Sequence, residues 1–228
     1  YNGETGPAYW GKLAPEYSKC NNGRQQSPIN LAQTTSDRAL GSDRESHTLQ
    51  LSWSPLHNVN AQHNGHTIQA DLSAEATANN TVTFDGKRYS LTQFHIHTPS
   101  EHRLDERHFD GELHFVSQSA DGQLLVTGIL LTAAPRGGTC LLNGIAAQVC
   151  GKSTTVPMFD LRALLQAVDN VQERWVYRGS LTTPPCTEGV RWVVAKRPLL
   201  VGFNAMAALR AAVGFNARDT MPVNLDQR

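Results

Sequence analysis

Short stretches of alternating apolar and polar side chains recur along the whole chain. Such alternation predicts β-strands that bury one face. We expect strands at Thr48–Trp53, Thr67–Leu72, Thr81–Phe84, Lys87–Leu91, Gln93–His97, Leu113–Ser117, Leu124–Leu131, Trp175–Arg178 and Val190–Lys196. Asp85-Gly86 joins two of these stretches and predicts a tight hairpin turn, and Asp121-Gly122 predicts another.

Helical periodicity is rare. Asp160–Ala167 predicts one short helix with its first residue as N-cap, and Ala205–Val213 predicts a second that ends at Gly214. Two further stretches predict loops: Ser73–Asn80 is polar, and Ala133–Ser153 is rich in glycine. The pattern favours a mainly β fold with a large sheet and a few short peripheral helices.

Length and composition narrow the possibilities. The 228 residues suit one domain, residues 1–228, with a sizeable core. Lys plus Arg equals Asp plus Glu, so the formal net charge is zero, which argues against a nucleic-acid-binding protein. No apolar run is long enough to predict a membrane span. The chain begins at Tyr1 rather than at Met, and we interpret it as a processed or trimmed chain.

The cysteines leave several possibilities open. They occupy positions 20, 140, 150 and 186, and no two form the C-x-x-C spacing of zinc ribbons or thioredoxin-type motifs. Four cysteines allow two disulfides in three connectivities, and reduced, buried thiols are the alternative. The nine histidines carry more information, because several of them fall on predicted strands.

Three histidines on two predicted strands point to a metal site. Side chains alternate between the faces of a strand, so Gln93, His95 and His97 share one face. On the next strand, Glu112 and His114 also share a face. If the two strands pair antiparallel, three imidazoles converge, which is the ligand set of a catalytic zinc site with one open position. Gln93 and Glu112 are suitably placed to accept the second ring N–H of a ligand.

Two other interpretations of these histidines need consideration. Histidines alternating along a strand often simply face solvent. A cupin-type iron or manganese site would use Glu101 as a ligand, but that pattern expects glycine where Tyr89 and His108 stand. The cupin interpretation is therefore the weaker one.

Six motifs in a fixed order carry a resemblance to a known family. They are Gln26-Ser27-Pro28-Ile29-Asn30, Asn64-Gly65-His66, Gln93-Phe94-His95-Ile96-His97, Ser100-Glu101-His102, Glu112-Leu113-His114-Phe115-Val116 and Ser180-Leu181-Thr182-Thr183-Pro184-Pro185. Together they resemble the α-class carbonic anhydrases across nearly the whole chain. The resemblance implies a twisted, mostly antiparallel sheet of about ten strands with a conical active-site cavity.

The resemblance also implies a role for each matching residue. His95, His97 and His114 correspond to the zinc ligands, Thr182 to the residue that orients the zinc-bound hydroxide, and Glu101 to the partner of that threonine. His66 corresponds to the proton shuttle, with the nearby His63 as its competitor. The substrate-binding residues implied are Thr183, Val116, Val126, Leu181, Val190 and Trp192. The C-terminal stretch departs from the family pattern, which leaves Asn216 and Arg218 without an assigned role.

The implied activity is the zinc-dependent, reversible hydration of carbon dioxide to bicarbonate and a proton, with weak esterase activity beside it. Sulfonamides and anions are the implied inhibitors, and the protein is expected as a monomer or homodimer. The resemblance to bacterial and extracellular enzymes implies a Cys20–Cys186 disulfide, and Cys140–Cys150 is expected as a second. Disulfides imply an extracellular or periplasmic location. A catalytically silent binding domain is the alternative, but it would lack ligands that are all present here.

Overall fold

The computed structural model describes residues 1, 3–31, 47–135, 142, 145 and 153–224. Its strands are β1 Asn30–Leu31, β2 Leu49–Ser52, β3 Leu56–His63, β4 Ile68–Asp71, β5 Thr81–Phe84, β6 Lys87–His97, β7 Arg103–Leu104, β8 Arg107–His108, β9 Gly111–Ser119, β10 Leu124–Ala134, β11 Ser153–Phe159, β12 Arg174–Ser180, β13 Glu188–Ala195 and β14 Leu199–Gly202. The α-helices are α1 Trp10–Leu13, α2 Lys19–Asn22, α4 Ala74–Asn79, α6 Leu161–Ala167 and α7 Phe203–Val213. Three single-turn 3₁₀ helices are η1 Gly3–Thr5, η2 Pro15–Tyr17 and η3 Asp169–Val171.

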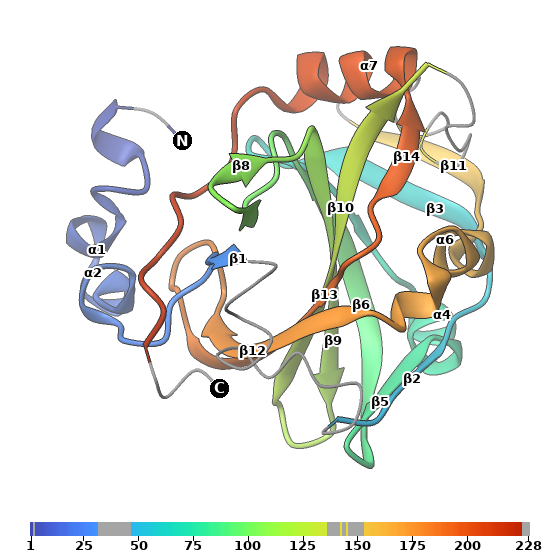
Figure 1. Cartoon of the computed structure of the whole chain (residues 1–228), viewed down its shortest axis with the longest axis horizontal. Coiled ribbons are helices and arrows are strands. Elements are labelled where there is room, and N and C mark those ends of the chain that lie inside the picture. Colours follow the sequence, from blue (N-terminus) through green and yellow to red (C-terminus); the bar gives the residue numbers. More distant parts are fainter. Residues whose placement is uncertain (2, 32–46, 136–141, 143–144, 146–152, 225–228) are drawn as a thin grey trace.

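A mixed sheet of 11 strands dominates the described part of the chain, which confirms the predicted mainly β class. Its main path runs β11-β3-β4-β6-β9-β10-β13-β12, with β5 beside β6, β2 beside β5 and β14 beside β10. Most neighbours are antiparallel, and β10 pairs in parallel with β13 and β14. In Figure 1 the N-terminal helices lie to one side of this sheet and α7 lies across one end. Among the described residues, no helix has the length and apolar character of a membrane span.

Each face of the sheet carries its own apolar cluster. Phe94, Ile96, Leu113 and Phe115 belong to the larger cluster, on the face covered by α6. The opposite face carries a smaller cluster centred on Trp192. The predicted ligand histidines alternate with the larger cluster's residues along β6 and β9, so they face the smaller cluster's side.

An extra residue in β6 sets which side chains face which way. The sequence predicts two strands here, Lys87–Leu91 and Gln93–His97, but β6 is one continuous strand whose pairing with β9 shifts between Leu91 and Gln93. Leu91 is buried in the larger cluster, and so is Phe94, three residues later. A bulge therefore reverses the alternation of faces at Thr92, as bulges do when two residues oppose one.

The sequence leaves β1, β7, β8, α1, α2 and the 3₁₀ helices unpredicted, and four further elements differ from the predictions in an instructive way. Ser73–Asn80 is not a loop: Ser73 Oγ accepts a hydrogen bond from the Ala76 amide and caps α4. β3 escapes prediction because Asn58, at φ 51°, breaks its alternation. β11 begins inside the expected loop and contains a proline, which an edge strand tolerates. β14 has only four residues and no clear alternation.

Other predictions are confirmed. Asp160 Oδ1 accepts from the Ala163 amide and caps α6, and Gly214, at φ 68°, ends α7. The hairpin at Asp85-Gly86 joins β5 to β6. Most of the expected loop at Ala133–Ser153, including Cys140 and Cys150, lies outside the described residues.

Candidate metal centre

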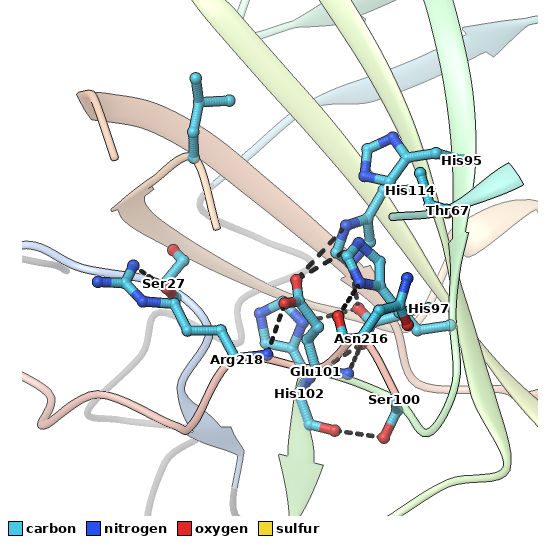
Figure 2. A network of polar contacts seen from close by, with 12 residues as sticks. Ser27, Thr67, His95, His97, Ser100, Glu101, His102, His114, Asn216 and Arg218 are labelled. Atoms are coloured by element: carbon cyan, nitrogen blue, oxygen red, sulfur yellow. Dashed lines mark hydrogen bonds and ion pairs between the residues drawn. The ribbon is translucent and has the colours of Figure 1, made fainter. Parts of the chain in front are cut away.

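The pairing of β6 with β9 brings the three predicted ligands together. His95 lies directly opposite His114, and His97 is two residues further along the same face of β6. Their ring centroids are 4.5 to 5.2 Å apart. One ring nitrogen from each lies within 4.8 Å of the others, so one ion can contact all three. Figure 2 shows the three imidazoles gathered around one point, with Glu101 beside them.

Burial keeps the imidazoles of His95 and His97 neutral. His97 and His114 are each 1% exposed. Burial lowers the pKa of His95 well below its ordinary value, and the neighbouring imidazoles lower it further. Burial also lowers the pKa of His97, although Glu101 acts in the opposite direction. Neutral imidazole is the form that binds a metal ion, so His95 and His97 are ready for one near neutral pH.

Hydrogen bonds at Nδ1 set the tautomers of the two histidines on β6. Gln93 Oε1 lies 2.8 Å from His95 Nδ1, as the sequence predicts for a supporting residue. The Asn216 carbonyl oxygen lies 2.9 Å from His97 Nδ1. Both acceptors require the ring proton on Nδ1, which leaves each Nε2 with a free lone pair. Asn216 was not assigned this role from the sequence, and a backbone carbonyl leaves no residue type to recognise.

Glu112 supports His114 and also holds the preceding loop. Its Oε1 lies 2.9 Å from His114 Nε2, a close contact outside regular hydrogen-bond angles, and 2.7 Å from His102 Nδ1. Its Oε2 accepts from the Glu101 and His102 amides at 3.0 and 2.9 Å. Burial alone would raise the pKa of Glu112, but His102 and His114 hold it well below its ordinary value. The carboxylate therefore favours the proton on His114 Nε2 and leaves Nδ1 for a metal.

A chain of buried polar groups continues from Glu112 to the far side of the site. His102 Nε2 lies 2.7 Å from the Tyr177 hydroxyl, which donates to Ser27 Oγ at 2.9 Å. Ser27 Oγ also accepts from the Ser180 amide at 3.0 Å. The motifs containing His102, Ser27 and Ser180 all matched the family, and this network gives them a common purpose. Tyr177 was missed, because a tyrosine within a strand usually indicates only packing.

Glu101 presents one carboxylate oxygen to the same point as the ligands. Its Oε1 accepts from the Arg218 amide at 2.9 Å. Its Oε2 has no hydrogen-bond partner among the described residues and lies 3.5 Å from His97 Nε2 and 3.9 Å from His114 Nδ1. An unpartnered buried carboxylate oxygen beside unpartnered imidazole nitrogens fits a cation. The expected hydrogen bond from Thr182 to Glu101 stays a prediction.

The C-terminal segment closes the back of the centre. The Asn216 amide side chain donates to the carbonyls of Ile96 and His66, both at 3.0 Å, and accepts from the Thr98 amide at 2.8 Å. The buried Arg218 guanidinium donates to Gln26 Oε1, to the Ser27 carbonyl and to the Cys20 carbonyl. These two residues, left without a role by the sequence, thus tie β6 to the N-terminal segment.

A cavity of about 480 Å³ opens onto His95 and His97. Its lining contains His66 and Thr183, two residues predicted to serve the reaction. His66 is exposed and contacts the Tyr1 ring at a centroid distance of 6.4 Å. His63 is absent from the lining formed by the described residues, and its Nδ1 accepts from the Gly65 amide at 3.1 Å. Of these two histidines, His66 borders the cavity, and its role as proton shuttle stays a prediction.

The five residues predicted to form an apolar wall share one location. Val116, Val126, Val190 and Trp192 belong to the smaller apolar cluster, and Leu181 packs against it. The Trp192 ring centroid lies 4.8 Å from that of His114, so the cluster borders the ligands. The described cavity is lined by other residues, and direct contact between this cluster and a substrate stays a prediction.

A disulfide joins Cys20 to Cys186, as the family resemblance implies. Both cysteines are buried and pack with Trp10, a residue of the cavity lining. The bridge connects the N-terminal helices to the loop that carries Thr182 and Thr183. The second expected bridge, Cys140–Cys150, lies outside the described residues.

Comparisons with known proteins agree with this geometry. A family model described as eukaryotic-type carbonic anhydrase matches residues 5–228. The chain is 35% identical to a carbonic anhydrase of Pectobacterium carotovorum, over 98% of this chain and 87% of that protein. The solved α-carbonic anhydrase of Aspergillus oryzae superposes with a TM-score of 0.87 at 32% identity, covering 98% of this chain and 92% of that one. The Thermovibrio ammonificans enzyme, solved with the inhibitor sulfanilamide, gives a TM-score of 0.82 at 32% identity, with coverages of 98% and 95%. The chain therefore belongs to the α-type carbonic anhydrase family, whose members are lyases that hydrate carbon dioxide.

Proposed function

We propose that this chain hydrates carbon dioxide reversibly with Zn²⁺ held by His95, His97 and His114. The observation that carries the proposal is the set of three converging imidazoles, each with a separate oxygen acceptor close to the ring nitrogen that does not face the metal position. Three imidazoles with a fourth position open are the ligand set of catalytic zinc. When bound, zinc supplies Lewis-acid activation of water, whose pKa falls to about 7, the value established for carbonic anhydrases as a family.

Thr182 and Glu101 orient the attacking oxygen in this proposal. Thr182 accepts a hydrogen bond from that oxygen and donates its own hydroxyl proton to Glu101. Glu101 Oε2 supports this role, because it lacks a partner among the described residues, whereas Oε1 is occupied by the Arg218 amide. A fixed carboxylate acceptor permits only one direction for the threonine proton, and this alignment lowers the entropic part of the barrier.

Carbon dioxide, an apolar molecule, binds against the cluster of Val116, Val126, Val190, Trp192 and Leu181 in this proposal. The nearness of Trp192 to His114 supports it. Thr183, in the cavity lining, hydrogen-bonds bicarbonate as it forms. An apolar surface beside a polar edge suits a reaction that converts an apolar substrate into an anion.

His66 carries the released proton to solvent. Its exposed ring borders the cavity, so it can exchange protons on both sides. Free imidazole has a pKa of about 6.5, which matches a carrier that must accept and release protons near neutral pH. His63 fits this role less well because its Nδ1 already accepts a backbone hydrogen bond.

Inhibitors, location and assembly follow the family. Primary sulfonamides and small anions bind at the open metal position, and the sulfanilamide complex of the Thermovibrio ammonificans relative supports this. The Cys20–Cys186 disulfide supports an extracellular or periplasmic location. We further propose a monomer or homodimer and weak esterase activity on activated esters.

Metal analysis together with stopped-flow measurement of carbon dioxide hydration tests the proposal. We expect about one zinc per chain, rapid hydration, and loss of both when a chelator removes the metal. Iron in place of zinc, without hydration, would overturn it. A zinc-loaded protein without hydration would instead indicate a silent binding domain.

A further inference from the structure

A second cavity, of about 410 Å³, contains two arginines that lack ionic partners in the described part of the chain. Arg178 lies on β12 directly opposite Arg191 on β13. Directly opposed side chains of an antiparallel pair share a face, with Cβ atoms about 5 Å apart. Among the described residues, neither guanidinium forms an ion pair or a hydrogen bond. We name this site the arginine cavity.

The nearby carboxylates form no ion pair with these arginines, although Asp85 also lines the cavity and acts to raise the pKa of Arg191. Asp85 accepts from the Thr48 amide at 2.9 Å and contacts His47 Nδ1 at 2.7 Å. Asp121 contacts the third cation of the lining, Lys87, at 2.6 Å. Like charges directly opposed across two strands destabilise a sheet. The fold thus maintains two adjacent positive charges, which Asp85 offsets only in part, in a chain whose formal net charge is zero.

Packing restrains Arg191 and partly shields it from water. The Arg191 guanidinium carbon lies 5.3 Å from the Phe84 ring centroid, which restrains that side chain. Arg191 is half-buried, and both burial and the nearby Arg178 lower its pKa from the ordinary value. Gln25 and Gln123 add amide groups to the lining. The lining thus contains two guanidinium forks and neutral amides beside one carboxylate, Asp85, that is engaged by Thr48 and His47. This excess of donors suits an oxyanion.

We propose that the arginine cavity binds a small, multiply charged oxyanion of the phosphate or sulfate type. Bidentate hydrogen bonds from the two guanidinium groups hold it, and its charge relieves their mutual repulsion. The site is separate from the metal ligands: Arg178 and Arg191 alternate along β12 and β13 with residues of the smaller apolar cluster, and so point to the opposite face of the sheet.

Thermal unfolding and phosphorus NMR, with inorganic phosphate as the probe, test this proposal. The variant is Arg178→Gln, because this exposed side chain forms no ion pair or hydrogen bond with the described residues. The matched control is Arg162→Gln, an exposed arginine on α6 outside the arginine cavity. Sodium chloride at the same ionic strength controls for general screening.

Phosphate should raise the Tm of the wild-type protein and of Arg162→Gln in a saturable way, by linkage to the native state. Arg178→Gln should bind phosphate about 10- to 100-fold more weakly, the factor expected from losing hydrogen bonds to a charged group. Without phosphate, its Tm should equal or exceed that of the wild type, because the repulsion has been removed. Damage to the fold would lower the Tm of Arg178→Gln both with and without phosphate. A Tm at or above that of the wild type without phosphate, and below it with phosphate, therefore indicates the loss of a binding site.

A second variant separates charge from geometry. Arg178→Lys keeps the positive charge but lacks the planar fork, so its affinity for phosphate should lie between those of the wild type and Arg178→Gln. Phosphate that binds at the histidines would affect all variants equally. An equal response of Arg178→Gln and the wild type, or no rise in Tm beyond that in chloride, would overturn the proposal.

Discussion

Replacing Glu112 with Gln should destabilise both the fold and the metal centre. The carboxylate receives four close contacts, two at each oxygen, from His114, His102 and two backbone amides. Gln offers one oxygen and one NH₂ group of the same size. Whichever way the Gln amide is oriented, its NH₂ group takes the place of one carboxylate oxygen. The two donors that contact that oxygen in the wild type then face an N–H donor instead of an acceptor.

The size of the effect follows from these contacts. A hydrogen bond to a charged group contributes about 1.5–3 kcal/mol, and two such contacts are lost in Glu112→Gln. We therefore expect the free energy of unfolding to fall by about 3–6 kcal/mol, which overlaps the range of about 3–5 kcal/mol known for breaking a buried ion pair. Without the carboxylate at His114 Nε2, metal affinity should fall by about 10- to 100-fold.

Urea unfolding and metal titration measure the two effects separately. Glu75→Gln, a change at an exposed position on α4, serves as the control and should shift the free energy of unfolding by no more than about 0.5 kcal/mol. If Glu112→Gln unfolded within about 1 kcal/mol of the wild type and bound zinc equally well, the contacts at Glu112 would not support the centre, and this reasoning would be wrong.

The pH dependence of stability provides a second readout at Glu112. Its pKa in the folded protein lies well below the unfolded value of about 4.3. A lowered carboxyl pKa stabilises the fold fully above the unfolded pKa, and this contribution is lost as the pH falls below it. Gln cannot take up that proton, so the stability of Glu112→Gln should decline less steeply below about pH 4.3 than that of the wild type.

Three further predictions concern the metal, the proton and the cysteines. His97→Ala should lose most bound zinc and most hydration activity, which metal analysis would detect; retention of both would contradict the ligand assignment. His66→Ala should lower kcat in weak buffer, leave kcat/KM nearly unchanged and recover with added imidazole; if His63→Ala lowers kcat instead, the shuttle is His63. Mass analysis of alkylated, non-reduced protein should find no modified thiol, because Cys140 and Cys150 are expected to form a second disulfide; two modified thiols would contradict that bridge, and four would contradict both.

Prediction of the fold from sequence succeeded where alternation was regular. The hairpin at Asp85-Gly86 and the cap at Asp160 depend on local chemistry that a short stretch of sequence contains. It failed at β3, where Asn58 interrupts the alternation, and at β14, whose pairing with β10 is decided by packing alone. Pairings between distant parallel strands leave little trace in either strand's own sequence.

In the candidate site, the contacts made by side chains could be predicted from the sequence, whereas those made by the backbone could not. The ligand histidines and Gln93 stand at alternating positions, so their convergence could be predicted. The contacts through the Asn216 carbonyl and the Arg218 amide could not, because any residue type provides those groups. Tyr177 joins the network only because β12 lies where its hydroxyl reaches His102.

The bulge at Thr92 gives β6 one residue more than regular pairing needs. The Thr92 side chain donates from Oγ1 to the Val116 carbonyl at 3.0 Å, and its backbone carbonyl accepts from the Leu72 amide at 2.9 Å. Leu91 and Gln93, on either side of it, already oppose Ser117 and Val116, which are consecutive residues of β9. An in-frame deletion of the Thr92 codon would therefore leave a regularly alternating strand, with His95 and His97 still on the face of the metal centre. Deletion of Ile96 is a different event, because beyond the bulge the loss of one residue would turn His97 into the larger apolar cluster. In the evolution of this strand, a shorter chain is thus a small step at the bulge and abolishes the ligand set a few residues later.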